Sequence, residues 1–242
     1  MTEKLSTSTD ELRPSAPGAM SYLRAIFAVL RKDLTAEFRS REIIASMLVF
    51  ALLVILIFNF ALELDLSTRT NVTAGVLWVT FAFAGTLGLN RSMASEKDRS
   101  SLDGLLLAPV DRSAIFFGKM LGNLLFMLGI EIIVLPVYYI LYNVNLFSMG
   151  FLGVVLLGSL GYVVVGTLLA TMAVQTRTRD VMLPILLFPV TIPLLIGAVK
   201  ASMGFLQGVP IEEIRPWLNL LIAYDLIFLA LSLMVFDYVV EE

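Results

Sequence analysis

Six stretches of the chain are apolar over lengths that suit a membrane-spanning helix. A helix needs about 20 residues to cross the roughly 30 Å hydrocarbon core of a bilayer. None of the stretches alternates between apolar and polar residues with a period of two, so a membrane barrel is not expected. The pattern predicts an all-α polytopic membrane protein with six transmembrane helices. These spans are expected at residues 43–62, 72–89, 115–142, 151–174, 181–199 and 217–236.

The residues before the first span divide into two parts. Residues 1–19 are polar and contain Pro, Ser and Thr, so we expect a disordered cytoplasmic tail. In residues 20–41, apolar positions recur every three to four residues while basic residues occupy the other faces. This pattern predicts an amphipathic helix in the membrane interface, and the alternative is a cytosolic helix packed on a partner. The apolar stripe comprises Leu23, Ile26, Phe27, Leu30, Leu34 and Phe38.

Residues 42–242 are expected to form a domain of six spans, whose connections alternate between the two sides of the membrane. Basic residues of the whole chain are distributed unevenly between these two sides. Fourteen of the 17 Lys and Arg residues lie on the side of the N-terminus, and three lie on the other. Cytoplasmic segments of membrane proteins carry an excess of Lys and Arg. Both termini are therefore expected in the cytoplasm. The three exceptions are Arg69, Lys200 and Arg215.

Composition agrees with a membrane protein and excludes several kinds of chemistry. The chain is 58% hydrophobic and only 15% charged, with a mean hydropathy of +0.89, whereas soluble domains are about a quarter charged. It has no His and no Cys, which removes the usual general base, the usual haem ligands and any disulfide. No G-x-x-x-x-G-K-[ST] motif occurs, so ATP hydrolysis by the chain's own P-loop is not expected. No catalytic, cofactor or metal site is predicted, which leaves transport or support of a membrane complex.

The connection at residues 90–114 contains a short helical pattern that begins at Ser and stops at Pro109. An exposed leucine face between charged residues suggests docking to another protein. The alternative is that the leucines dip into the membrane interface beneath the bundle. The leucine face comprises Leu102, Leu105 and Leu106, and charged residues beside it include Glu96, Asp98 and Arg99.

The fifth span is unusual because Pro184, Pro189 and Pro193 fall within one uncharged run. Proline removes a helix hydrogen bond and clashes with the preceding turn, but neighbouring helices or Ser and Thr side chains can satisfy the freed carbonyls in a bundle. Thr191 lies between two of the prolines. We expect a kinked or broken segment near mid-membrane, which is either a static bend or a deformable element.

Two carboxyl groups and two amides lie inside the predicted spans. Glu131 and Asp225 should face the bundle or water, because a charged carboxylate at mid-membrane costs about 2.5–3.5 kcal/mol. The alternative is that each is a protonated or hydrogen-bonded structural group. Asn123 and Asn219 can hydrogen-bond between helices. A stripe of small residues, suited to close helix contact, comprises Ala114, Gly118 and Gly122.

The order of a basic interfacial helix, two spans, a long loop and four more spans resembles the type-2 class of ABC exporter permeases. Residues 90–123, "NRSMASEKDRSSLDGLLLAPVDRSAIFFGKMLGN", and 183–198, "LPILLFPVTIPLLIGA", are similar to the CcmB family. That family provides the permease of the haem exporter of cytochrome c maturation. The resemblance runs from about Ala25 to Phe236.

The resemblance implies a bacterial inner-membrane complex with the ATPase CcmA, a second copy of the permease, CcmC and CcmD. ATP would bind the ATPase, and partner subunits would handle haem, either by export or by release of the haem-loaded chaperone CcmE. Residues 90–114 would then be the coupling element, and the proline run a candidate for the moving part. Surrounding lipid is expected as a partner, and nucleic acid is not. The alternatives are a generic type-2 permease for lipid, polysaccharide or drug, and a passive scaffold.

Overall fold

The computed structural model describes residues 19–61, 66–98, 111–174 and 179–239. Throughout these ranges the regular structure is helical, and no strand occurs in them. The helices are α1 (Ala19–Ser40), α2 (Glu42–Ala61), α3 (Leu66–Asp98), α5 (Arg112–Tyr142), α6 (Met149–Val174), α7 (Arg179–Gln207) and α8 (Ile211–Val239).

The predicted fold class is confirmed, since six described helices, α2, α3 and α5–α8, are long and apolar enough to cross a membrane. Several helices extend beyond their expected ends. α3 continues to Asp98, and α7 and α8 are separated only by residues 208–210. The expected long connection at 200–216 is therefore mostly helical. Charged residues such as Lys200 and Arg215, both exposed, are compatible with helical turns that project beyond the hydrocarbon.

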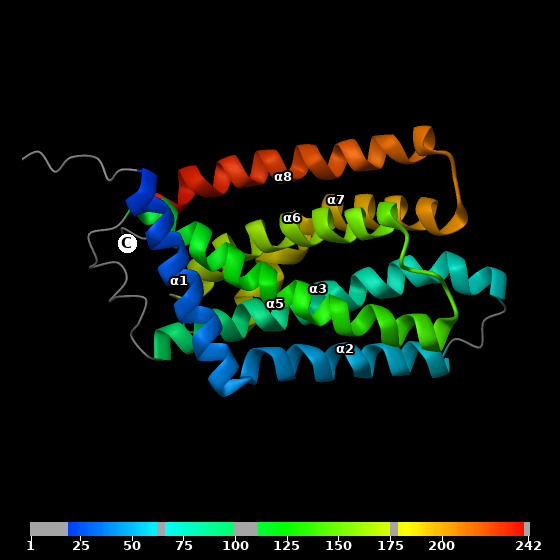
Figure 1. Ribbon diagram of the computed structural model, residues 1–242, viewed down its shortest axis with the longest axis horizontal. Coiled ribbons are helices and arrows are strands. Elements are labelled where there is room, and N and C mark those ends of the chain that lie inside the picture. The colour runs from blue at the N-terminus through cyan, green and yellow to red at the C-terminus, as the bar shows by residue number, and fades with distance from the viewer. Residues whose placement is uncertain (1–18, 62–65, 99–110, 175–178, 240–242) are drawn as a thin grey trace, which may run out of the picture.

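The six long helices run side by side, and α1 lies across one end of them (Figure 1). We call this end the α1 end. It also holds the last turns of α3, α6 and α8 and the first turns of α5 and α7. The opposite end holds the last turn of α2, the first turn of α3 and the connections from α5 to α6 and from α7 to α8. Arg69, Lys200 and Arg215 lie toward that opposite end, and the cytoplasmic orientation of the α1 end stays a prediction.

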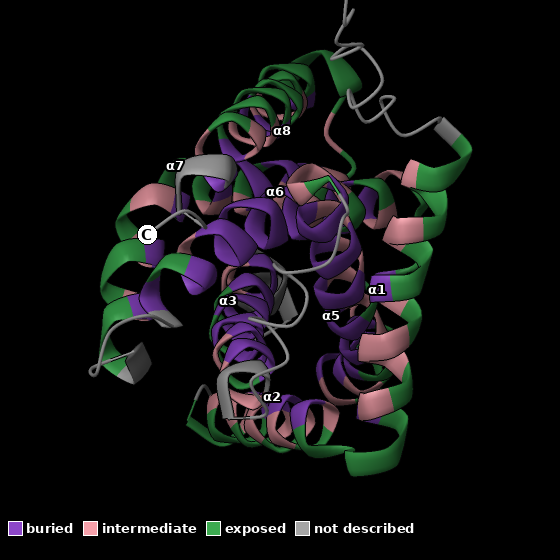
Figure 2. Ribbon diagram, turned by 90° about the vertical axis from the view of Figure 1, so that its left-hand side faces the viewer, coloured by how far each residue is buried: buried purple, intermediate pink, exposed green. Residues whose placement is uncertain are grey.

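The core of the bundle is built around α3 and α6. Their apolar segments are mostly buried, whereas α2 and α8 expose most of theirs (Figure 2). Trp78 of α3 is buried against Gly158 of α6, whose missing side chain leaves room for the indole ring. The indole Nε1 donates a hydrogen bond to Ser202 Oγ of α7 at 2.9 Å. One side chain thus connects three helices.

A sharp corner joins α1 to α2 at Arg41, whose φ of 58° lies in the left-handed region. The buried side chain of Glu37 stabilises this corner. Its Oε1 accepts a hydrogen bond from the backbone N–H of Ile44 at 2.8 Å, and its Oε2 accepts one from Ser40 Oγ at 3.4 Å. The first backbone N–H groups of a helix have no partner within the helix, so Glu37 caps α2 from the preceding element.

Candidate functional site

The stripe of small residues on α5 is the place where α1 docks. A Cβ atom at Gly118 would lie 2.6 Å from Val29 Cβ and 3.1 Å from the carbonyl oxygen of Ile26. One turn further along α5, a Cβ at Gly122 would lie 3.7 Å from Asp33 Cβ. The small residues therefore allow close contact, as predicted, and the helix that makes the contact is α1. We call this contact the α1–α5 joint.

Polar contacts hold the joint at several levels. Lys119 Nζ lies 3.9 Å from Asp33 Oδ2, and Lys119 is only 1% exposed. Asp33 Oδ1 also lies 3.2 Å from Lys32 Nζ. Nearer the start of α1, the hydroxyls of Tyr22 and Ser113 are 2.9 Å apart. Removing one partner of a buried ion pair leaves an uncompensated charge, so loss of the Asp33 carboxylate would leave Lys119 buried without this counter-charge.

The predicted coupling segment begins and ends at the α1 end of the bundle. Glu96 and Asp98 belong to the last turns of α3. Arg99 and the leucine face, Leu102, Leu105 and Leu106, lie outside the described residues, so their docking role stays a prediction. At the far side of the segment, Asp111 caps α5, because its Oδ1 accepts a hydrogen bond from the Ser113 N–H at 2.9 Å. The segment therefore leads directly into the α1–α5 joint.

The proline run lies within one continuous helix, α7, so it is not broken there, and the predicted kink stays a prediction. Thr191 is fully buried, and its hydroxyl donates to the carbonyl of Leu187 at 2.9 Å. Tyr224 of α8 donates to the carbonyl of Val190 at 3.1 Å, beside Pro193. Pro189 and Pro193 themselves are exposed. Thr191 and Tyr224 thus donate to carbonyls of the proline run. The carbonyls that Pro189 and Pro193 leave without a backbone donor are those of Ile185 and Pro189, four residues earlier.

The intramembrane polar residues occupy different surroundings. Glu131 is buried and accepts a hydrogen bond from Ser159 of α6, while its second oxygen has no partner among the described residues. Asn123 donates to Thr167 Oγ1 of α6 at 3.1 Å, as expected for a bond between helices. Asp225 is 7% exposed, and neither of its oxygens has a hydrogen-bond partner in the described part of the chain. Asn219 is exposed on α8 and faces away from the bundle.

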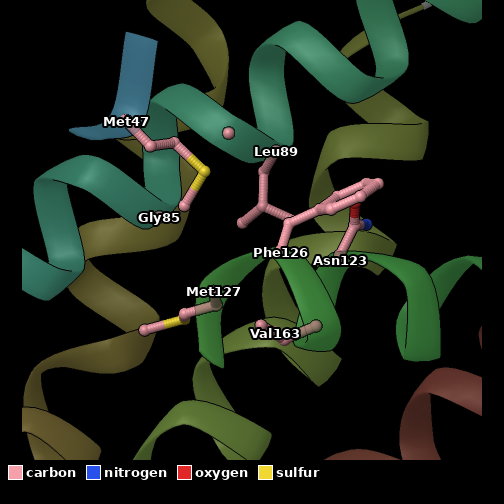
Figure 3. A pocket seen from close by; sticks show the side chains of 8 residues that line it. Met47, Gly85, Leu89, Asn123, Phe126, Met127 and Val163 are labelled. Carbon is pink, nitrogen blue, oxygen red and sulfur yellow. The ribbon is translucent and has the colours of Figure 1, made fainter. Parts of the chain in front are cut away.

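A small cavity lies between α2, α3, α5 and α6 (Figure 3). Its volume of about 10 Å³ is close to the minimum for one water molecule, and far too small for a porphyrin. In the described residues, no cluster of three or more Asp, Glu, His or Cys side chains could hold a metal ion. The lining residues are Met47, Gly85, Gly88, Leu89, Asn123, Phe126, Met127 and Val163.

Sequence reasoning missed the residues that hold α1 in place. Lys119 is one of the fourteen basic residues on the side of the N-terminus, and a lysine just inside an apolar span calls for a carboxylate partner. Asp33 and Glu37 are the two acidic residues within an otherwise basic amphipathic helix. Acidic residues are almost never fully buried unless they are paired, so their position in this helix was a signal to look for partners. Nothing in the sequence pointed to the bond between Trp78 and Ser202.

Comparison with known proteins gives a consistent result over nearly the whole chain. The family model described as "CcmB protein" matches residues 24–241. A protein named "Heme exporter protein B" from Bradyrhizobium diazoefficiens is 26% identical over 212 residues, which cover 87% of this chain and 94% of that protein. Proteins of the same name from Rhodobacter capsulatus and Escherichia coli K12 are each 27% identical, over 76% and 81% of this chain and 85% and 89% of their own lengths. The chain belongs to the CcmB family.

Proposed function

We propose that this chain is the permease subunit of an ABC transporter of cytochrome c maturation. A separate ATPase subunit hydrolyses ATP, and the permease converts that hydrolysis into haem export or into release of the haem-loaded chaperone CcmE. The observation that carries the proposal is the CcmB family match over residues 24–241. Relatives aligned over most of their length are named "Heme exporter protein B".

The architecture supports a permease that depends on a partner for ATP. Six of the described helices are long and apolar enough to span a membrane, and the sequence contains no P-loop motif. The proposed partners are the ATPase CcmA, a second copy of this chain, CcmC, CcmD and the chaperone CcmE, in the bacterial inner membrane. The absence of histidine and cysteine favours chaperone release over passage of haem through this subunit, because haem iron would lack its usual protein ligands.

We propose residues 90–114 as the coupling element that receives motion from the ATPase. This segment connects the last turns of α3 to the first turn of α5. Because α5 is fixed to α1 through Gly118 and the Lys119–Asp33 pair, a displacement of the segment acts on two helices at once. The proline helix α7 is the proposed moving part, since its exposed prolines interrupt the regular hydrogen-bond pattern.

The coupling role is tested by substituting the leucine face. Burying a leucine contributes about 1.5–3 kcal/mol, so Leu105→Asp is expected to lower the affinity for purified ATPase by one to two orders of magnitude. The matched control is Asp103→Asn, at the rim of the same predicted helix, which should matter far less. Unchanged affinity for Leu105→Asp would refute docking through this face and direct attention to residues 175–180.

The wider function is tested by co-purification of the intact complex, followed by identification of the bound subunits and any haem. Recovery of an ATPase with CcmC, CcmD and CcmE is the expected result. A generic type-2 permease would bring an ATPase but none of the haem-handling partners. A passive scaffold would assemble with partners whose activity does not depend on ATP hydrolysis, which an ATPase variant unable to hydrolyse ATP would reveal.

A further inference from the structure

Helix α1 carries acidic and basic residues, and the structure engages the acidic ones within the protein while three arginines of α1 are exposed. Asp33 lies against Lys32 and the buried Lys119. Glu37 is 2% exposed and is engaged by the backbone of Ile44 and the hydroxyl of Ser40. Both acidic side chains of α1 are therefore occupied by contacts within the protein. The negative charge of α1 contributes little to its outer surface.

The outer surface of α1 is both basic and apolar. Figure 2 shows α1 along the outer side of α5, with its exposed residues turned away from the bundle. The exposed basic residues are Arg24, Arg31, Arg39 and, at the corner, Arg41. The exposed apolar residues are Met20, Leu23, Phe27 and Phe38, each more than 60% exposed.

The spacing along α1 places exposed basic and exposed apolar residues side by side. Arg24 and Arg31 lie three and four positions from Phe27, so all three side chains project from neighbouring turns of one face. Met20, Leu23 and Phe27 lie in the first half of α1 and Phe38 lies in its last turn, so exposed apolar side chains occur near both ends of a helix of about 33 Å. A compact protein pocket would meet only part of that length, whereas a flat surface meets all of it.

We propose that α1 binds anionic phospholipid, with its arginines on the headgroups and its exposed apolar side chains among the upper acyl chains. Three observations support a lipid surface as the occupant. α1 lies across the ends of the spanning helices, where headgroups are found (Figure 1). Its outer charge is complementary to an anionic leaflet, and its apolar face fits the interfacial depth at which amphipathic helices insert. This inference depends on the position of α1 and not on the proposed transport function.

The test uses the fact that the chain has no native cysteine. Ala28→Cys, at an exposed position between Arg24 and Arg31, is labelled with a fluorophore, and the full chain is reconstituted in phosphatidylcholine bilayers. Trace amounts of brominated phosphatidylglycerol or brominated phosphatidylcholine then quench the label. The ratio of the two quenching efficiencies reports the local enrichment of anionic lipid. We expect phosphatidylglycerol to quench several-fold more strongly, and the excess to shrink as salt screens the arginines.

Substitutions distinguish an effect of arginine charge on lipid preference from an effect on the fold of the protein. Each basic residue near an anionic surface changes the preference by a factor of about five, so Arg24→Gln with Arg31→Gln should remove most of the excess quenching. Arg24→Lys with Arg31→Lys keeps the charge and should keep the preference. The matched control is Arg215→Gln, an exposed arginine at the opposite end of the bundle, which should have no effect. Equal quenching by the two lipids in the parent protein would overturn the proposal, as would a preference that survives the double Gln substitution. Either result would favour an acidic partner protein, rather than lipid, as the ligand of the exposed arginines of α1.

Discussion

Replacing Gly118 by Ala is expected to weaken the attachment of α1 to the bundle. An added Cβ would lie 2.6 Å from Val29 Cβ, 2.8 Å from Val29 Cγ1 and 3.1 Å from the carbonyl oxygen of Ile26. Ordinary contacts of a Cβ atom begin at 3.4 Å, so α1 and α5 must separate by about 0.8 Å at this level. The same separation lengthens the 3.9 Å contact between Lys119 and Asp33 one residue away.

Opposing effects set the size of the change in stability. Inserting a methyl group into a tightly packed contact costs about 1–3 kcal/mol. Replacing glycine by alanine within a helix contributes about 0.5–1 kcal/mol in the other direction. The net loss of stability for Gly118→Ala is therefore about 0–2.5 kcal/mol. Gly129, on the same helix, provides the matched control, because a Cβ there meets nothing within 4 Å. Gly129→Ala is expected to stabilise the protein by about 0.5–1 kcal/mol.

Thermal unfolding of the two purified variants in detergent gives the comparison. Gly118→Ala should unfold at a lower temperature than the parent, and Gly129→Ala at the same or a higher temperature. A single cysteine at Ile26, half-buried beside Gly118, should react faster with a soluble thiol reagent in the Gly118→Ala background only. If Gly118→Ala were as stable as Gly129→Ala and left this cysteine protected, the close α1–α5 joint would be refuted.

Three further outcomes are expected. Single cysteines placed in residues 143–150 should be labelled only from the side opposite the cytoplasm, and labelling from the cytoplasm alone would contradict the predicted topology. Ser202→Ala should destabilise the protein by about 1–3 kcal/mol, because the buried Trp78 N–H loses its acceptor. Ser46→Ala is the control in the same thermal assay, because the Ser46 hydroxyl donates to the carbonyl of Ile43 within its own helix. The isolated chain should show no saturable Soret band when titrated with haem, since it has no His or Cys; a band abolished by one Met or Tyr substitution would disprove this.

The number of spanning helices could be predicted because the bilayer imposes it on the sequence. A run such as residues 43–62 has no favourable place outside hydrocarbon, so its length and polarity determine its role. The helix ends could not be predicted in the same way. Beyond the hydrocarbon, water satisfies the backbone whether it is helical or not, and the hydrophobic pattern no longer distinguishes the two. This explains why α3 and α7 continue past their expected ends at 89 and 199.

The sequence pattern also could not predict which helices contact one another. The stripe at Gly118 and Gly122 predicted a close contact, yet spacing alone does not name the opposing helix, and the opposing helix is α1 rather than one of the six long apolar helices. The partner of Lys119 is likewise distant in sequence, at Asp33. Such contacts depend on how α1 turns at Arg41, where one residue in the left-handed region sets the direction of the whole helix.

The contacts of the two intramembrane carboxyl groups could not be predicted from the sequence either, and both groups contact helix α6. Their sequence surroundings are similar, but Glu131 receives a hydrogen bond from Ser159, whereas Asp225 is accommodated by space, since a side chain at Gly161 would collide with its Oδ1. Ser159 and Gly161 are two residues apart on α6 and therefore face opposite sides of that helix. Both carboxyl groups, one from α5 and one from α8, thus depend on the central segment of α6. Any displacement of α6 therefore changes the surroundings of both carboxyl groups together. Substituting Glu131 or Asp225 alone would not reveal this shared dependence.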